Sequence, residues 1–290
     1  MEAPASPAPP ELPGSATARW RAIVRARAAQ MDAAYARLGR TSADFWDRRA
    51  RAFHRATRDA TRDPFFHLLA RHVGPRTRVL DVGAGTGRFT LALAPRAARV
   101  IAVEPNASML APLQEELARQ RLQNVEVIQA RWEECADLTA DVVIASHVLY
   151  PLEDAAGFLR RLDRATRRRC FVTLRALHLD ALTDPLWRHF HGEPRRLPPT
   201  HVDGLALLAE LGILADVQIL ATPQSWRYPD LETAVDEYLE QLILPDTPAT
   251  RAELAALLRA WLAPTEDGGL RVPRDTMPVG VLSWGPERRL

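Results

Sequence analysis

The feature that most constrains the chain is a glycine loop, Asp81–Gly87, set between an apolar run and a helical pattern. The run Arg78–Val82 predicts a buried strand, and the pattern that begins at Arg88 predicts a helix. Glycines in such a turn let the backbone bend sharply and approach a ligand closely, and the helix start beyond them offers unpaired backbone N–H groups. Because nucleotides bind at the carboxyl ends of parallel strands, we expect a nucleotide-containing ligand at this loop.

The spacing of the glycines narrows the choice of ligand. They fall at positions 83, 85 and 87, and Arg88 stands where the dinucleotide fingerprint has its third glycine. A pyrophosphate packed on this helix would meet a bulky side chain, which disfavours a nicotinamide oxidoreductase. A Walker loop needs a Gly-Lys pair, and all 38 Lys and Arg residues of the chain are arginine. The pattern therefore favours a ligand without phosphate.

An acidic residue follows at the end of the second apolar run. Glu104 ends the run that begins at Arg99, 21 residues after Gly83. A carboxylate at this place can accept hydrogen bonds from both hydroxyls of a ribose. The alternative is a solvated carboxylate at the end of a strand. With the glycine loop upstream, ribose binding is the favoured interpretation.

Apolar runs and helical patterns alternate through the middle of the chain. This alternation predicts an α/β fold with a mostly parallel sheet of about seven strands, the last one antiparallel, covered by helices on both faces. The predicted strands cover residues 78–82, 99–104, 125–128, 141–145, 170–174, 216–221 and 277–284, the last as an edge strand. The predicted helices between the first five strands cover residues 88–94, 108–120 and 155–165.

The flanking segments differ in composition from this core, residues 76–176. Residues 1–16 are rich in Pro and Ala and are expected to be a disordered tail. Residues 17–75 read as a helical extension that covers the core. Residues 177–290 are expected to add substrate-cover elements and the final strands of the same sheet. Within them we expect an irregular excursion over 185–200, a helix over 202–211, and a helical insertion over 231–242 and 250–262.

Several motifs in order give the chain a family resemblance. The run Val79–Gly87 resembles motif I of the class I S-adenosylmethionine-dependent methyltransferases. The segments Glu104–Leu110, Ala130–Glu134 and Asp141–Leu149 resemble the family's second, third and fourth strand exits. The resemblance spans residues 77–174, about a third of the chain. It implies a Rossmann-like fold, methyl transfer as the activity, S-adenosylmethionine as cofactor and S-adenosylhomocysteine as product.

The resemblance also implies which residues hold the cofactor. Glu104 would bind the ribose hydroxyls, and Ser146 would lie at the mouth of the site, near the sulfonium. The remaining contacts, to the methionine part, would come from Asp81 and from the backbone of Gly83, Ala84, Gly85 and Gly87.

The adenine contacts follow the family less closely. Pro105 and Met109 would pack on the adenine ring. The family often has an aspartate after the third strand, and this chain has Arg131 there. Trp132 would then cover the adenine, and Glu133 would accept a hydrogen bond from its amine.

Two residues after the fourth strand are candidates for the chemistry. The sulfonium is already an activated leaving group, so the protein mainly has to align the acceptor and exclude water. A base is needed where the acceptor must lose a proton. His147 is the candidate base, with packing beside the cofactor as its alternative role. Tyr150 is expected to form a wall of the site rather than to act as a base.

Arginines are dense between Arg19 and Arg62, and they leave the chemical class of the methyl acceptor undecided. We favour solvated helix faces with intrahelical ion pairs, and with them a small-molecule acceptor. The rivals are an RNA or protein methyltransferase that uses these helices, and a non-catalytic protein that binds S-adenosylmethionine. A nucleic-acid partner is not favoured because the net charge is +2. Phe45, Trp46 and Phe53 are candidates for a lid over the cofactor.

The remaining residues suggest neither a metal site nor a membrane-spanning segment. His189, His191 and His201 lack acidic or cysteine partners at useful spacing, so we expect no metal site. The two cysteines, Cys135 and Cys170, lack metal-ligand spacing and fit a reduced, cytoplasmic protein. No apolar run reaches 18 residues, so no membrane span is expected. The oligomeric state stays open.

Overall fold

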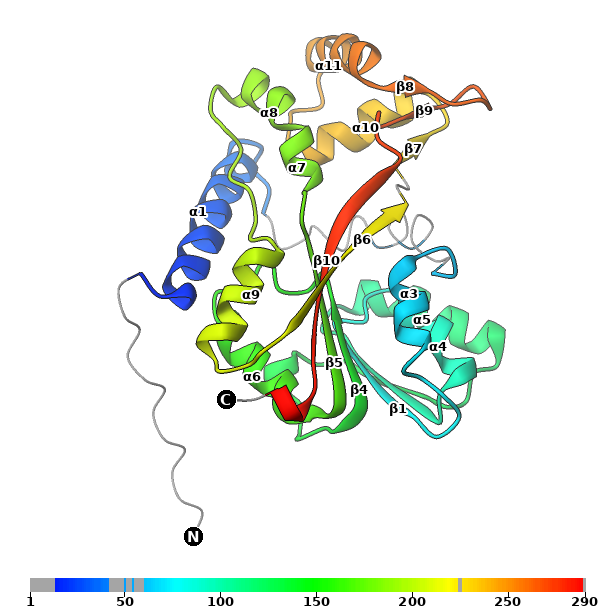
Figure 1. Cartoon of the computed structure of the whole chain (residues 1–290). Coiled ribbons are helices and arrows are strands. Elements are labelled where there is room, and N and C mark those ends of the chain that lie inside the picture. The colour runs from blue at the N-terminus through cyan, green and yellow to red at the C-terminus, as the bar shows by residue number, and fades with distance from the viewer. Residues whose placement is uncertain (1–13, 42–49, 51–53, 55–59, 224–225, 289–290) are drawn as a thin grey trace.

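A seven-stranded sheet forms the centre of the molecule (Figure 1). The computed structural model describes residues 14–41, 50, 54, 60–223 and 226–288. The strands lie in the order β3-β2-β1-β4-β5-β10-β6. Their bounds are β1 Arg78–Val82, β2 Arg99–Val103, β3 Val125–Ile128, β4 Ala140–Ser146, β5 Thr166–Arg175, β6 Asp216–Pro223 and β10 Thr276–Trp284.

The strand directions confirm the predicted fold class. Strands β1 to β5 pair in parallel, and β10 is antiparallel to its neighbours. The expectation that β10 is an edge strand was wrong, because it lies between β5 and β6. The burial of the two strands explains the order: β10 is buried along most of its length, whereas β6 is largely exposed and forms the edge. A nearly continuous apolar run is typical of a central strand.

Helices cover both faces of the sheet, as predicted. On one face, α3 (Pro64–Ala70), α4 (Arg88–Leu93) and α5 (Ala107–Gln120) bury aromatic and aliphatic side chains against β1, β2 and β4. On the other face, α6 (Ala155–Ala165) packs on β4 and β5, and α9 (His201–Glu210) packs on β5 and β10, while α1 (Ala16–Arg37) lies against α6 and α9 (Figure 1). The predicted helix that holds Phe45, Trp46 and Phe53 lies outside the described residues, as does the predicted tail up to residue 13.

A second layer of structure stands above the carboxyl ends of the strands (Figure 1). It holds α7 (Leu179–Leu182), α8 (Asp184–His191), α10 (Leu231–Gln241) and α11 (Pro248–Trp261). It also holds a small antiparallel sheet with the order β7-β9-β8, which we did not predict. Its strands are β7 Arg227–Tyr228, β8 Ala263–Pro264 and β9 Leu270–Arg271. We call this layer, together with α1, the cover.

The expected irregular excursion over residues 185–200 was partly wrong. Residues 184–191 form α8, which carries Pro185 in its first turn and ends at Gly192, where the backbone is left-handed. Proline suits a first helical turn because its missing N–H would be unpaired there. Trp187 of α8 is fully buried among side chains of α10 and α11. The buried tryptophan, rather than the local composition, makes this segment helical.

The arginines of α1 pair with other elements. Arg25 lies 2.7 Å from Glu153, and Arg27 lies 2.8 Å from Asp180. Arg19 pairs with Asp203 of α9. For these three residues the expectation of ion pairs within the helix was wrong. The arginines instead help to attach α1 to the rest of the molecule.

Within the described ranges, no helix is both long and apolar enough to cross a membrane.

Candidate functional site

The glycine loop lies where β1 ends, beside the ends of β2 and β4. The Gly83 N–H donates to the carbonyl of Val103, over 2.8 Å. Gly83, Gly85 and Gly87 have φ angles of +72°, +56° and +85°. Only glycine adopts this left-handed conformation without a steric cost. A Cβ on Gly83 would also clash with the side chain of Val148, so glycine lets the segment after β4 approach the loop closely.

Glu104 connects the loop to the end of β2. Its carboxylate accepts hydrogen bonds from the N–H groups of Gly85 and Asn106, each over 3.0 Å. The side chain is buried, and this burial raises its pKa. A carboxylate has about four acceptor positions, so about two remain beyond these bonds. Glu104 therefore has the acceptor capacity that a ribose diol requires.

Asp81 lies buried beneath the loop. It accepts a hydrogen bond from the hydroxyl of Thr90 on α4, over 2.7 Å. Burial raises the pKa of Asp81 to about 6. The buried hydroxyl of Thr86 has no hydrogen-bond partner within the described part of the chain. A cationic and hydrogen-bonding ligand would satisfy both groups, so the loop fits the amino-acid end of S-adenosylmethionine.

Pro105 and Met109, which are predicted to pack on the adenine, follow Glu104 in the sequence, and their adenine contacts stay predictions. Met109 opens α5, where its N–H donates to the side chain of Asn106, over 2.9 Å. Its Cε lies 3.2 Å from the place of a Cβ on Gly85. Pro105 is exposed. An apolar side chain thus flanks both the loop and the acidic strand end.

The other three predicted adenine residues lie in the turn after β3. Arg131 and Glu133 are exposed, with 3.9 Å between their charged groups. Trp132 is buried, and the guanidinium of Arg161 on α6 lies 4.9 Å from its ring centroid. The Trp132 indole also borders a cavity of about 240 Å³ near the end of α6. The structure accounts for Trp132 as a core side chain against α6, and the adenine contacts stay predictions.

The predicted catalytic residues meet at the exit of β4. His147 follows the strand with a φ of +60°, and its Nδ1 lies 2.9 Å from the hydroxyl of Tyr150. That hydroxyl accepts a hydrogen bond from the N–H of Arg175. The Oγ of Ser146 lies 2.9 Å from that of Thr173 on β5. The ends of β4 and β5 therefore form one hydrogen-bonded rim, which we call the mouth.

Burial keeps the His147 and Tyr150 side chains of the mouth uncharged. It lowers the pKa of His147 well below its usual value, and nearby arginines add to the effect. It raises the pKa of Tyr150 to about 12. His147 is therefore a neutral imidazole, which can accept a proton, whereas Tyr150 stays protonated.

Sequence reasoning missed His178 and Arg175. The ring of His178 packs edge-on against Tyr150, 5.0 Å between centroids, and its Nε2 lies 3.0 Å from the carbonyl of Pro199. Burial lowers the pKa of His178 to about 4. Arg175 ends β5 and His178 follows it, and the carboxyl end of β5 lies beside that of β4. The rule that neighbouring parallel strands end at the same edge could have found them.

The histidines singled out as possible metal ligands lie apart from the mouth. His189 pairs with Glu253 of α11, and His191 contacts the carbonyl of Leu242. His201 opens α9 and packs on Gly280 of β10. The structure brings none of these three residues to the glycine loop.

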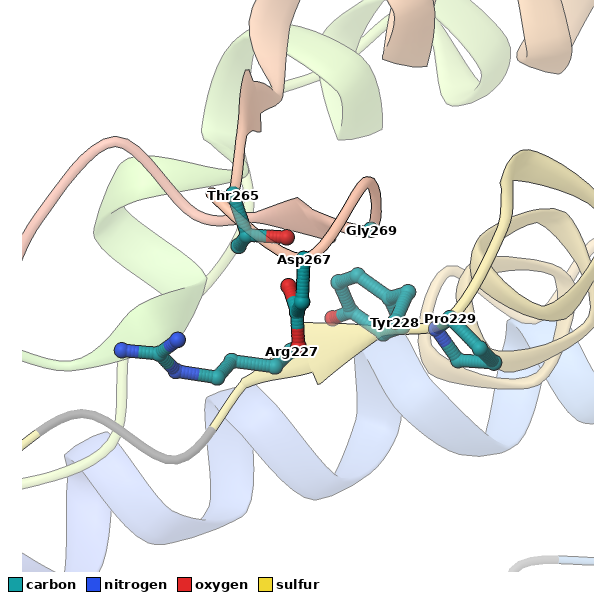
Figure 2. A pocket seen from close by; sticks show the side chains of 6 residues that line it. All are labelled: Arg227, Tyr228, Pro229, Thr265, Asp267 and Gly269. Atoms are coloured by element: carbon teal, nitrogen blue, oxygen red, sulfur yellow. The ribbon is translucent and has the colours of Figure 1, made fainter.

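A cavity of about 320 Å³ lies in the small sheet of the cover (Figure 2). Its lining comes from β7 and from the turn that joins β8 to β9. In Figure 2, Arg227 and Tyr228 extend to opposite sides of β7, and Asp267 points between them. Tyr228 is buried against α10, so the cavity belongs to the packing of the cover.

The fold and the loop define a class of protein. A mostly parallel sheet, a glycine loop after its first strand and an acidic end to its second strand are the arrangement predicted from the methyltransferase resemblance. Residues 80–173 match the family of methyltransferase domains. This part of the chain matches a methyltransferase domain and has a Rossmann-like fold, in agreement with the resemblance seen in the sequence.

Solved structures support the same fold over a larger part of the chain. The YcgJ protein of Bacillus subtilis is similar at 16% identity and a TM-score of 0.51, covering 75% of this chain and 96% of that protein. A protein of Bacillus halodurans C-125 assigned as a methyltransferase is similar at 13% identity and a TM-score of 0.50, covering 76% and 95%. No curated protein sequence matches the chain.

Proposed function

We propose that the protein transfers the methyl group of S-adenosylmethionine to a small-molecule acceptor held between the mouth and the cover. The match of residues 80–173 to methyltransferase domains carries this proposal, because it includes the glycine loop and the strand exits that bear the predicted site. The loop and Glu104 bind the cofactor. α1 and residues 177–290 enclose the acceptor.

The ion pairs of α1 support a small acceptor over a nucleic acid. Arg19, Arg25 and Arg27 each pair with a carboxylate of another element. Such arginines are neutralised and contribute little to the attraction of a phosphate backbone. The described face of α1 therefore lacks the unpaired basic stripe that RNA binding needs.

His147 acts at the mouth as the base or as a hydrogen-bonding wall. Its neutral imidazole lies one residue from Val148, whose side chain contacts Gly83 of the cofactor loop. An acceptor hydroxyl or amine placed there would face the methyl group and the imidazole together. Tyr150 holds the imidazole in place through its hydroxyl.

The test measures cofactor class and methyl transfer separately. S-adenosylhomocysteine should raise the melting temperature of the full chain, and NAD should not. Replacing Glu104→Gln should weaken S-adenosylhomocysteine binding by about 10-fold or more, since one to two hydrogen bonds to a charged group are worth about 1.5–3 kcal/mol each. The control is Glu126→Gln, because Glu126 is an exposed carboxylate on the adjacent strand, paired with Arg99.

Transfer itself is then measured with S-adenosylmethionine labelled in its methyl group and a panel of small alcohols, phenols, amines and acids. Transfer to at least one of them supports the proposal. Transfer to RNA or protein alone would overturn the small acceptor, and stabilisation by NAD alone would overturn the cofactor.

A further inference from the structure

Among the described residues, one cation at the mouth lacks a carboxylate partner. Arg175 ends β5, and its backbone N–H donates to the Tyr150 hydroxyl, over 2.9 Å. Its side chain is half-buried, and its guanidinium lies 5.4 Å from the ring centroid of Trp226. Among the residues that the structure describes, no carboxylate forms an ion pair with it. A half-buried guanidinium without a counter-ion is costly unless a ligand supplies one.

The other charged groups around the mouth are already paired or bonded. Arg88 lies 2.7 Å from Asp63. Asp180 lies 2.8 Å from Arg27 and also pairs with Arg195. In the described part of the mouth, the positive charge of Arg175 is thus the uncompensated one.

The remaining mouth residues add no charge near neutral pH. Burial keeps His147 and His178 neutral by lowering their pKa values, and it keeps Tyr150 protonated. An acceptor entering the mouth therefore meets one net positive charge, beside the aromatic face of Trp226. Guanidinium groups bind carboxylate and phosphate through two parallel hydrogen bonds.

We propose that Arg175 binds an anionic group of the methyl acceptor, a carboxylate or a phosphate, and so holds the acceptor's nucleophilic atom toward His147 and the cofactor loop. Trp226 holds the guanidinium by stacking and offers a flat surface to the acceptor. This inference rests on the proposed function and adds the substrate class: small anionic acceptors. Arg175 is a specificity-determining residue, since it holds a part of the acceptor that does not react.

The test uses small probes of known charge with the full chain and saturating S-adenosylhomocysteine. Benzoate and phenyl phosphate carry the anionic groups, and benzamide is the neutral match of benzoate. Calorimetry should detect benzoate or phenyl phosphate binding at least 10-fold more tightly than benzamide. Which of the two binds more tightly distinguishes carboxylate from phosphate. Equal binding of all three probes, or no binding of either anion, would overturn the proposal.

Two variants connect the preference to Arg175. Arg175→Met keeps the apolar stem and should remove the 10-fold preference for the anion, whereas Arg175→Lys keeps the charge and should retain part of it. Arg25→Met is the matched control, because Arg25 is an exposed arginine on α1. A preference that survives in Arg175→Met would overturn the proposal.

Binding of S-adenosylhomocysteine to each variant provides the independent measurement. Because the cofactor loop does not include Arg175, the affinity of each variant for S-adenosylhomocysteine should stay within about two-fold of that of the parent chain. Failure of the parent chain to bind S-adenosylhomocysteine would instead refute the proposed function. The two failures are therefore distinguishable.

Discussion

The cofactor-binding core and the cover are held together by different kinds of contact. At the cofactor loop of the core, carboxylates bond to hydroxyl and backbone N–H groups, as Asp81 does with Thr90 and Glu104 with Gly85. In the cover, a buried arginine joins distant segments. Arg195 pairs with Asp180, over 3.2 Å, and its guanidinium donates to the carbonyl of Gln241.

This difference shows what each region requires from its residues. In the proposed function the core binds a ligand through backbone N–H groups, so its glycines and its two carboxylates must stay in place. The cover needs to keep its helices assembled around an acceptor. The side chain of Arg195 is 2% exposed, and its guanidinium lies 4.7 Å from the ring centroid of Trp187. The cover therefore depends on a buried side-chain ion pair that joins its segments, whereas the polar groups at the cofactor loop depend on backbone and hydroxyl partners.

The largest expected effect is on the stability of the cover. Arg195→Met should lower the free energy of unfolding by about 3 kcal/mol, because removing one member of a buried ion pair leaves its partner uncompensated. Because Asp180 keeps its pair with Arg27, we expect the loss of stability to lie at the lower end of the range of about 3–5 kcal/mol for a broken buried ion pair. Urea denaturation measures it. S-adenosylhomocysteine should still bind, since the core does not include Arg195.

An exposed arginine of the same region is the control for this comparison. Arg25→Met removes an ion pair with Glu153 whose side chains are 64% and 48% exposed. Exposed pairs of this kind contribute about 0–1 kcal/mol. Equal losses from Arg25→Met and Arg195→Met would contradict the view that Arg195 holds the cover together.

A smaller effect is expected when a methyl group is added to the cofactor loop. Gly83→Ala should lower stability by about 2 kcal/mol, since a left-handed alanine costs about 1–2 kcal/mol and its Cβ would clash with Val148. Binding of S-adenosylhomocysteine, measured by calorimetry, should weaken at least 10-fold because the loop must shift.

A glycine of the cover separates the two causes. Gly268 has a φ of +83° and no atom within 4 Å of its Cβ position. Gly268→Ala therefore adds the backbone cost without the clash, and it should lower stability by about 1 kcal/mol with no change in cofactor binding. If Gly83→Ala bound the cofactor as tightly as Gly268→Ala does, the close approach of Val148 to the loop would have no functional role.

The core was predictable because its signals are local. The apolar runs at β1 to β4 and the glycine loop each lie within about ten residues, and the spacing of Glu104 from Gly83 could be read directly. The position of β10 was not predictable in the same way. Its place between β5 and β6 depends on pairing with strands far away in the sequence. Likewise, the helix α8 forms because Trp187 is buried by distant helices.

The site was predictable to the extent that it follows strand ends. Glu104, His147 and Tyr150 lie where the motifs place them, around the glycine loop and the exit of β4. Arg175 and His178 escaped notice because an arginine and a histidine after a strand have no fixed spacing to any motif. Their position at the mouth is set by Tyr150, whose hydroxyl accepts from the Arg175 N–H and whose ring packs against His178.

The smallest expected effect concerns the pH dependence of cofactor binding. Asp81 has its pKa raised from 3.8 to about 6 by burial. The folded state therefore binds more protons than the unfolded state between these values, and this carboxyl contributes less stability as the pH rises through that window. A cationic cofactor group near Asp81 requires the ionised form. Binding of S-adenosylhomocysteine should thus weaken about 10-fold, or about 1.4 kcal/mol, between pH 7 and pH 5.

Calorimetry across this pH range with two variants assigns the effect. Asp81→Asn should bind S-adenosylhomocysteine more weakly at pH 7 and lose the pH dependence, because the amide does not titrate. Burial also raises the pKa of Glu104, so Glu104→Gln is the matched variant and should retain the dependence. The opposite pattern, in which Asp81→Asn keeps the pH dependence of binding and Glu104→Gln loses it, would show that Glu104 and not Asp81 is the titrating group. Glu104, rather than Asp81, would then control how acid weakens cofactor binding.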